Sequence, residues 1–402
     1  MSNHKIRIGV FSDSINIPPK EGMTVHTYNM LLSIAASSEL EVLLIVCDRG
    51  WLDLDILEKQ PFNTLVLSSD DFYNHEKIAE IVRDYKLDIL QTHTVYMTAA
   101  VLGKVSHITR KPLCVEFHDI EKMITPIYNL SSEEIAYHHE LQYRAGCFSS
   151  LVRIMSSHDY DYINSIWPDL RPNILWLPPG IPAPAKVGDM NKKREGKLLL
   201  IGNMHYPPNA HAASYIVDSL APRLPNTKFS LVGRGTEQFS GVNINAHGMV
   251  DSLDEFLQTH VIGLAPIFEG SGMKIKLLDY LSAGLPVVTT PIGASGYPKS
   301  DAIIVEEDVD KWPAILSRLL SDRADLERRS AIARKLFLDH FDLDKITHQL
   351  IKTYKQLQYD PIKTYLDFPD IQVDQDKIYW FKVINDMPRK PVTEPQYYEG
   401  VL

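Results

Sequence analysis

The sequence has little of what marks secreted, membrane-spanning or metal-binding chains. It has only three cysteines among 402 residues. They lie far apart beside apolar runs, without metal-ligand spacing, and we read them as buried thiols in a reducing compartment. No apolar run reaches the ~20 residues that a membrane-spanning helix needs. Residues 1–10 already form a strand pattern and lack the core of a signal peptide. These absences predict a cytoplasmic protein. The cysteines are Cys47, Cys114 and Cys147.

Positive charge and metal ligands are also scarce. The formal net charge of −10 argues against nucleic-acid binding over the whole surface, but it leaves room for a local basic patch and a peripheral contact at the inner membrane face. Asp53-Leu54-Asp55 lies in an acidic loop, and the pair His138-His139 has no third ligand at metal spacing. We therefore expect no metal and no other cofactor.

Strand-like and helix-like segments alternate through both halves of the chain, which predicts two α/β domains with parallel, doubly wound, Rossmann-like sheets. The length also favours two domains over one. In the second half, we expect strands at Lys197–Ile201 and Lys228–Val232, and helices at Lys274–Ser282 and over a long region from Ala324 to Gln358. A proline-rich, charged stretch, Pro178–Gly196, reads as the linker and hinge between them. The predicted divisions are an N-terminal domain at 1–180, a C-terminal domain at 197–342, and a crossover helix and tail at 343–402 that pack on the N-terminal domain.

The most informative motif is a glycine loop between an apolar run and an amphipathic segment. The loop is Gly270-Ser271-Gly272, and Lys276 and Asp279 follow it. A strand, a glycine loop and a helix start together present backbone N–H groups to a phosphate. On a continuous helix Gly272, Lys276 and Asp279 would share one face.

This block resembles the nucleotide-sugar site of glycosyltransferase family 4, whose members are retaining enzymes with the two-domain GT-B fold. The similar branch has the signature Gly-Ser-Gly-Thr-Arg/Lys-x-Lys-x-Leu-Glu, followed by Ala-Gly-x-Pro-Val-Val. The chain matches it from Gly270 to Asp279 and again from Ala283 to Val288, with Met273 in the threonine position. The resemblance implies a GT-B fold whose domains face across a cleft, with the last helix crossing back to the N-terminal domain.

The resemblance assigns Asp279 to the ribose hydroxyls and Lys274 and Lys276 to the diphosphate. Because the two lysines lie about 200° apart on a regular helix, both can reach the diphosphate only if Lys274 precedes the helix. Asn203 stands where most family members have a phosphate-binding arginine, so the two lysines would replace it. Glu269 stands where the family has a glutamate that contacts the donor sugar, although nine residues separate it from Asp279, more than is usual in the family.

Other positions follow from the same resemblance. On the donor side, backbone or side-chain contacts to the nucleotide are expected from Gly22, Gly202, Asn203, Arg234, Val250 and the glycine-loop residues Gly270, Ser271, Gly272 and Met273. On the acceptor side, His26 lies one turn into the first helix and could face either the cleft or the core. His118 and Asp119 follow a strand, where function concentrates. We expect catalytic roles for His118, Glu269 and Lys276.

The resemblance therefore predicts a glycosyltransferase that moves a sugar from a nucleoside-diphosphate sugar to a hydroxyl by a metal-independent, front-face mechanism. The acceptor could be a glycan, a lipid-linked intermediate, a protein or a small molecule. Two alternatives stay open. One is a sugar-nucleotide epimerase on the same fold, and the other is a non-catalytic GT-B partner or chaperone subunit, which the departures at Asn203 and in the acid spacing would favour.

Overall fold

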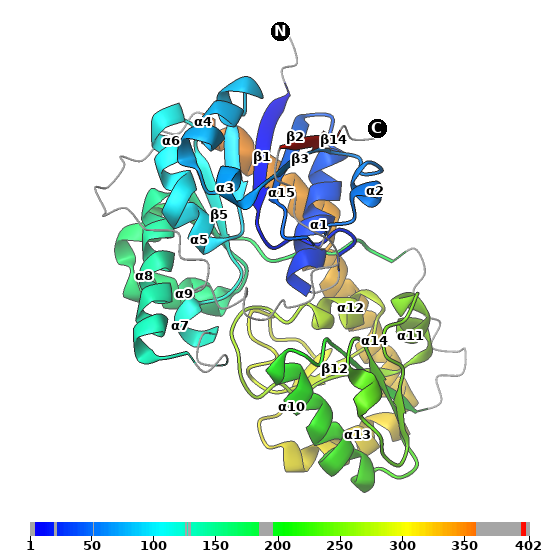
Figure 1. Ribbon diagram of the computed structural model, residues 1–402. Helices are drawn as coiled ribbons and strands as arrows, with labels where there is room; N and C mark the ends of the chain where they lie inside the picture. Colours follow the sequence, from blue (N-terminus) through cyan, green and yellow to red (C-terminus); the bar gives the residue numbers. More distant parts are fainter. Residues whose placement is uncertain are drawn as a thin grey trace. The chain divides into compact units, whose positions relative to one another are not determined.

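The computed structural model describes residues 5–19, 22–50, 52–124, 127, 130–184, 196–358 and 395–398. The chain divides into two units (Figure 1). Unit 1 is Met1–Leu177 together with Asp344–Leu402, and unit 2 is Pro178–Leu343. Each unit is an α/β structure around one sheet. In the described part of the chain, no helix combines the length and apolar character needed to cross a bilayer.

The unit 1 sheet has the strand order β14-β3-β2-β1-β4-β5-β6-β7. All neighbouring strands are parallel except β14, which pairs antiparallel with β3 at the sheet edge. The strands are β1 (Ile6–Ser12), β2 (Leu40–Cys47), β3 (Asn63–Leu67), β4 (Ile89–Thr92), β5 (Leu113–Phe117), β6 (Leu151–Ile154), β7 (Ile174–Trp176) and β14 (Gln396–Tyr398).

Helices cover both faces of this sheet because its strands are apolar on both sides. In β2, Val42 and Leu44 belong to the same buried cluster as helices α1 and α15, whereas Leu43 and Ile45 belong to the cluster with α4 and α6. This alternation follows the two-residue repeat of a strand. The helices are α1 (Gly22–Ala35), α2 (Leu54–Leu57), α3 (Ser69–Phe72), α4 (His75–Asp84), α5 (Val95–Met97), α6 (Gly103–Thr109), α7 (Glu121–Ile124), α8 (Ser132–Phe148), α9 (Ser157–Ile166) and α15 (Leu343–Leu357), with the π-helical segment η1 (Thr98–Leu102) and the 3₁₀ segment η3 (Pro168–Asn173).

Helix α15 ties the C-terminal segment to unit 1. Its buried residues recur at helical spacing, and burial of each apolar side chain of this size contributes about 1.5–3 kcal/mol. Ser33 of α1 and Thr347 of α15 also share a hydrogen bond of 2.7 Å. The residues of α15 that join this core are Ile346, Leu350, Ile351, Tyr354 and Leu357.

Unit 2 has an all-parallel sheet with the order β10-β9-β8-β11-β12-β13. The strands are β8 (Lys197–Ile201), β9 (Lys228–Val232), β10 (Ile244–Ala246), β11 (Ile262–Ala265), β12 (Val287–Thr289) and β13 (Ile303–Val305). The helical segments are α10 (Pro207–Tyr215), η4 (Ile216–Leu220), η5 (Ala221–Arg223), η6 (Thr236–Gln238), α11 (Leu253–Thr259), α12 (Lys276–Ser282), η7 (Val309–Lys311), α13 (Trp312–Ser321) and α14 (Arg323–His340).

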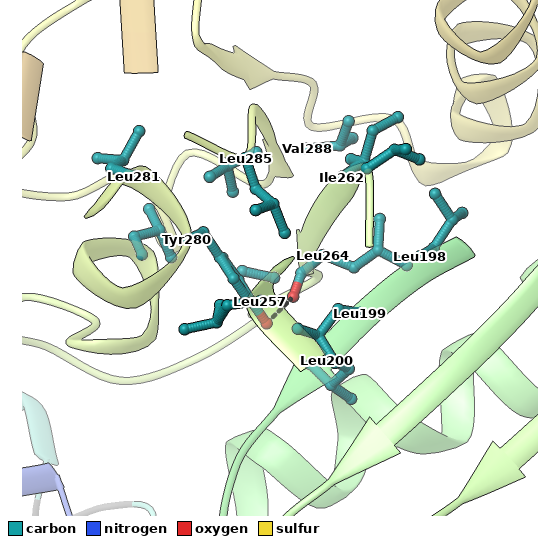
Figure 2. Close-up of a cluster of buried hydrophobic side chains, with 14 of the residues drawn as sticks. Leu198, Leu199, Leu200, Leu257, Ile262, Leu264, Tyr280, Leu281, Leu285 and Val288 are labelled. Atoms are coloured by element: carbon teal, nitrogen blue, oxygen red, sulfur yellow. Dashed lines mark hydrogen bonds between the residues drawn. The ribbon is translucent and has the colours of Figure 1, made fainter. Parts of the chain in front are cut away.

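Tyr280 fixes α12 against the centre of the unit 2 sheet (Figure 2). Its ring lies over Gly263, where an added Cβ atom would come within 2.3 Å of the ring. Its hydroxyl donates to the carbonyl of Leu264 at 3.2 Å and accepts from the N–H of Ile201 at 2.9 Å. The buried polar tip is therefore satisfied between two neighbouring strands, and the start of α12 is held next to β8 and β11.

The structure confirms the predicted fold class of two doubly wound α/β parts. It also corrects two local expectations. The helix expected from Lys274 begins only at Lys276, so Gly272 does not share its face and Lys274 lies in the loop. The predicted long helical region 324–358 is broken between α14 and α15, where the backbone of Ile181 bonds to Phe341 and Leu343. Most of the linker, residues 185–195, and residues 359–394 of the tail lie outside the described part.

Candidate functional site

The strand order of unit 2 places a topological switch point between β8 and β11. From β8 the chain continues to β9 on one side, whereas β11 lies on the other. In open parallel sheets, ligands bind outside the carboxyl ends of the strands at such a point. The loop after β8 contains Gly202 and Asn203, and the loop after β11 contains Glu269 and the glycine loop. The donor residues expected from the sequence thus follow the two strands that define the switch point.

Gly202 and Gly233 bring the first two loops into close contact. The N–H of Gly202 donates to the carbonyl of Val232 at 2.9 Å, and the N–H of Gly233 donates to the carbonyl of Gly248 at 2.8 Å. Gly233 has a φ of +124°. A Cβ atom there would lie 2.1 Å from the carbonyl oxygen of Gly202. Only glycine permits this approach.

The glycine loop is held by its own lysine. Lys274 Nζ donates to the carbonyl oxygens of Ser271 at 2.5 Å and Gly272 at 3.0 Å. Gly270 and Gly272 have φ values of +108° and +71°, and Ser271 is buried. Tyr297 donates to the carbonyl of Lys274 at 3.0 Å. Lys274 therefore stabilises the loop, and Met273 beside it packs partly against the core.

Lys276 is oriented by an asparagine that the sequence analysis did not identify. Lys276 Nζ donates to Asn209 Oδ1 at 2.6 Å, and Asn209 Nδ2 donates to the carbonyl of Asn203 at 2.9 Å. This chain of contacts joins the loop after β8, the first turn of α10 and the first residue of α12. The lysine is thereby fixed at the switch point of unit 2.

The local environment shifts the pKa values of the two charged residues of α12 toward each other. Burial, and then the charge of Lys274, lowers the pKa of Lys276 to about 7. Burial, and then the charge of Asp254, raises the pKa of Asp279 to about 7. Both side chains are half-buried. Such shifts are typical of binding and catalytic sites, because the groups are held where an incoming charge can restore their ionised form.

Glu269 forms an ion pair with His211, a residue that the sequence does not mark as part of the site. His211 Nδ1 lies 2.7 Å from Glu269 Oε1, and the two side chains are 60% and 37% exposed. His211 lies on α10, two residues after Asn209, which is the partner of Lys276. The pair gives the site an exposed carboxylate whose orientation depends on α10.

Asn209 contacts Lys276, and His211 contacts Glu269, so one short helix orients two of the expected donor residues. Neither Asn209 nor His211 belongs to the motif, and only their place after β8 in an α/β unit could have drawn attention to them.

Two further expected donor positions lie at the neighbouring loops. The carbonyl of Arg234 accepts from the N–H of Met204 at 2.8 Å, while its side chain is exposed. Val250 is half-buried and packs against the unit 2 core. The structure thus brings the loops of Gly202, Arg234 and Gly248 together through backbone contacts.

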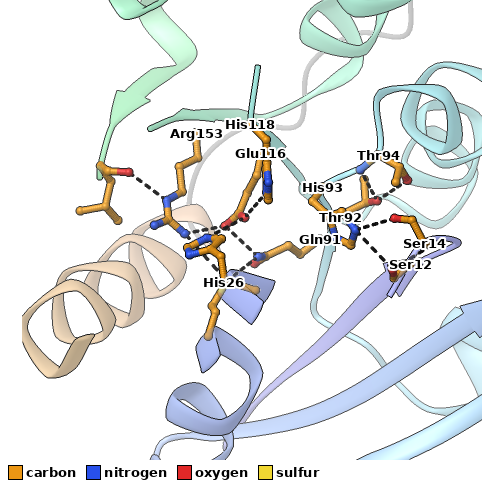
Figure 3. A network of polar contacts seen from close by, with 12 residues as sticks. Ser12, Ser14, His26, Gln91, Thr92, His93, Thr94, Glu116, His118 and Arg153 are labelled. Carbon is orange, nitrogen blue, oxygen red and sulfur yellow. Dashed lines mark hydrogen bonds and ion pairs between the residues drawn. The ribbon is translucent and has the colours of Figure 1, made fainter. Parts of the chain in front are cut away.

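In unit 1, the expected acceptor-side residues surround the buried carboxylate of Glu116 (Figure 3). Arg153 Nη1 lies 2.5 Å from Glu116 Oε1, and Gln91 Nε2 donates to the same oxygen at 3.3 Å. Tyr354 of α15 donates in turn to Gln91 Oε1. Burial by itself raises the pKa of Glu116, but Arg153 and the neighbouring histidines outweigh it and hold that pKa well below its usual value.

His26 and His118 face the other oxygen of Glu116. Their Nε2 atoms lie 3.7 Å and 3.4 Å from Glu116 Oε2. His26 is only 2% exposed, so it is a buried residue of unit 1. Burial lowers the pKa of His26 to about 4, against the opposing effect of Glu116. The imidazole is therefore neutral at physiological pH.

His93 adds a third imidazole at the switch point of the unit 1 sheet, between β1 and β4. Its Nε2 lies 3.3 Å from Ser12 Oγ and 3.1 Å from Ser14 Oγ, and its ring centroid is 5.6 Å from that of His118. Burial lowers the pKa of His93 to about 3. In the sequence, His93 follows a predicted strand and is a weaker candidate than His118.

Two further positions expected in unit 1 are Gly22 and Asp119. Gly22 is the first residue of α1 and is exposed. Asp119 is half-buried, and its backbone carbonyl accepts from Gln142 Nε2 at 2.8 Å. The sequence did not predict the ion pair between Glu116 and Arg153. The two residues lie on neighbouring strands, and the sequence of one strand does not reveal a charged partner on the next.

Comparisons with known proteins agree with this architecture. Residues 195–322 match the family model described as Glycosyl transferases group 1. A comparison with curated protein sequences finds no match. Among solved structures, the chain is similar to sucrose-phosphate synthase from Thermosynechococcus elongatus, with a TM-score of 0.69 and 15% identity over 88% of this chain and 99% of that one.

Two further structures have similar scores. A glycosyltransferase from Rickettsia africae ESF-5 gives a TM-score of 0.67 at 13% identity, over 89% of this chain and 100% of that one. HepE from Anabaena, in complex with UDP and glucose, gives 0.67 at 15% identity, over 87% and 99%. These similarities confirm the GT-B fold, and the family match confirms a glycosyltransferase group 1 domain at residues 195–322.

Proposed function

We propose that this protein is a retaining glycosyltransferase of family 4 that uses a nucleoside-diphosphate sugar and a hydroxyl acceptor without a metal ion. The observation that carries the proposal is the Asn203–Asn209–Lys276 chain of hydrogen bonds at the switch point of unit 2. It lies within the segment that matches the glycosyltransferase group 1 model. A fixed cation there, with Asp279 on the same short helix, suits a diphosphate and the adjacent ribose.

In the proposed reaction, the bond between the anomeric carbon and the leaving phosphate oxygen breaks. The acceptor oxygen bonds to that carbon on the same face, and its proton passes to a phosphate oxygen. Lys276 stabilises the charge that develops on the diphosphate, while Lys274 keeps the glycine loop in place. Glu269 contacts the donor sugar, and His118 orients groups on the acceptor side. Transfer assays with glycan, lipid-linked, protein and small-molecule acceptors identify the acceptor class.

Nucleotide binding is the first test. Calorimetric titration with uridine, guanosine, adenosine and thymidine diphosphates identifies the base, and uridine is tried first because HepE was solved with UDP. Lys276→Ala and Asp279→Ala should each weaken the binding. The matched control is Lys228→Ala, because Lys228 is exposed at the opposite, amino end of the same sheet. Failure of every nucleotide to bind would contradict the proposal.

Slow hydrolysis of the donor sugar then tests the stereochemistry without a known acceptor. Proton nuclear magnetic resonance, recorded before the released sugar mutarotates, should show the anomer present in the donor. The opposite anomer would contradict retention. Binding without hydrolysis or transfer to any acceptor class would instead support the non-catalytic partner.

A further inference from the structure

His26, Glu116 and His118, here called the histidine–carboxylate cluster, leave their facing atoms without hydrogen bonds. Among the described residues, His26 Nε2, Glu116 Oε2 and His118 Nε2 have no hydrogen-bond partner. The side chains of His26 and Glu116 are 2% and 0% exposed. Unsatisfied buried polar atoms cost free energy, and three that converge on one point indicate an unoccupied ligand position.

The spacing of the three atoms fits a metal ion. One ligand atom from each residue lies within 4.8 Å of the others. The distances of 3.7 Å and 3.4 Å from Glu116 Oε2 to the two imidazole nitrogens exceed a good hydrogen bond. Ligands about 2.1 Å from a tetrahedral zinc ion are separated by about 3.4 Å. Small side-chain rotations would therefore bring all three atoms to bonding distance.

Neighbouring side chains orient the carboxylate of Glu116 for binding a cation. Arg153 and Gln91 both hold Glu116 Oε1, which directs Oε2 toward the two histidines. Ligating carboxylates are commonly fixed by such outer hydrogen bonds. The positive charge of Arg153 opposes the ion, so we expect moderate affinity.

We propose that the histidine–carboxylate cluster binds one zinc-class divalent ion through His26, Glu116 and His118. Two imidazoles and one carboxylate suit Zn²⁺ or Co²⁺, whereas Mg²⁺ and Ca²⁺ prefer oxygen ligands. This differs from the sequence-based expectation of no metal site. The ion is not a cofactor of the proposed transfer, although it would occupy the side chain of His118, which the proposed function places on the acceptor side. Its binding is measured without nucleotide or sugar.

The test is a titration of the full chain with Co²⁺, followed by visible absorption. We expect one Co²⁺ per chain with the intense bands of a tetrahedral site, and displacement by Zn²⁺. His118→Gln should weaken binding by more than about 100-fold, since even outer-shell changes cost 10–100-fold. His26→Gln should have the same effect. Glu116→Gln is not used, because it would leave Arg153 buried without its carboxylate.

The control is His138→Gln. His138 Nδ1 lies 3.8 Å from Glu121 Oε2 in a second buried histidine–carboxylate pair, which belongs to no three-ligand group among the described residues. Circular dichroism establishes that each variant is folded. Absence of the tetrahedral bands in the folded wild-type chain would overturn the proposal, as would unchanged bands in both His118→Gln and His26→Gln.

Discussion

Lys276 Nζ, at the first residue of α12, donates a 2.6 Å hydrogen bond to Asn209 Oδ1 in the first turn of α10. Asn209 in turn donates to the carbonyl of Asn203, so one amide side chain connects the loop after β8 to the start of α12. Lys276 is therefore held at the start of α12, beside the loop after β8. The position of that lysine depends on Asn209.

The first prediction concerns this amide. Asn209→Ala removes the acceptor that orients Lys276, and a hydrogen bond contributes about 1 kcal/mol, so nucleoside-diphosphate affinity should fall by about fivefold. Calorimetric titration measures the change. Asn226→Ala, at an exposed turn position of unit 2, is the control and should leave the affinity unchanged. Equal affinities for both variants would show that Asn209 does not position the lysine.

The second prediction is a pH dependence of donor binding. Lys276 loses its proton as the pH rises through its pKa of about 7, so its attraction for the diphosphate falls. Asp279 becomes ionised over the same range, because its pKa is also about 7, and its carboxylate then accepts ribose hydroxyls more strongly. Affinity for a nucleoside-diphosphate sugar, which has no proton to lose near neutral pH, should therefore peak near pH 7.

Lys276→Arg separates these two effects. A guanidinium stays charged, so this variant should keep the rise in affinity with pH and lose the fall above pH 7. One pH unit above the lysine pKa, the wild-type affinity should be lower than its maximum by up to about tenfold. Titration at several pH values checks this. A wild-type profile identical to that of Lys276→Arg would mean that Lys276 does not titrate in this range.

The third prediction concerns Gly233. Alanine there would place Cβ 2.1 Å from the carbonyl oxygen of Gly202 in a backbone with φ of +124°. Strain of this kind costs on the order of 1–3 kcal/mol before the clash is counted, and we expect a lower Tm by thermal unfolding. Gly196→Ala is matched in having a positive φ, +47°, but has no atom within 4 Å of the added Cβ. Gly196→Ala should lower the Tm less than Gly233→Ala does. An equal loss of Tm would mean that the positive φ alone, and not the clash with Gly202, causes the effect.

The fourth prediction concerns the buried ion pair of unit 1. Arg153 and Glu116 are both 0% exposed and 2.5 Å apart. Arg153→Met leaves the carboxylate uncompensated, so the free energy of unfolding should fall by about 3–5 kcal/mol. The double variant Arg153→Met/Glu116→Gln removes both charges and should recover part of the loss. Urea unfolding of the full chain measures both. Additive losses would show that the two side chains are not coupled.

The sequence by itself determined the secondary structure and the donor motif. Alternating and helical apolar patterns are local, and they predict strands such as β8 and β9 at their observed bounds. The glycine loop and the two lysines also stand out, because glycines and a cation within a few residues are typical of phosphate-binding loops, and their role in this chain stays a prediction. The start of the following helix was misplaced, because the pattern continues back to Lys274 whereas α12 begins at Lys276.

Only the tertiary structure decided which side chains meet. Asn209 lies 67 positions before Lys276, and Glu116 lies 37 before Arg153. Nothing local distinguishes these residues from ordinary polar positions. The burial of His26 beside Glu116 likewise depends on how α1 packs on β5. Hydrophobic periodicity is encoded within each element, whereas contacts between buried polar groups arise from the order of strands in the sheet, which brings distant loop ends to one edge.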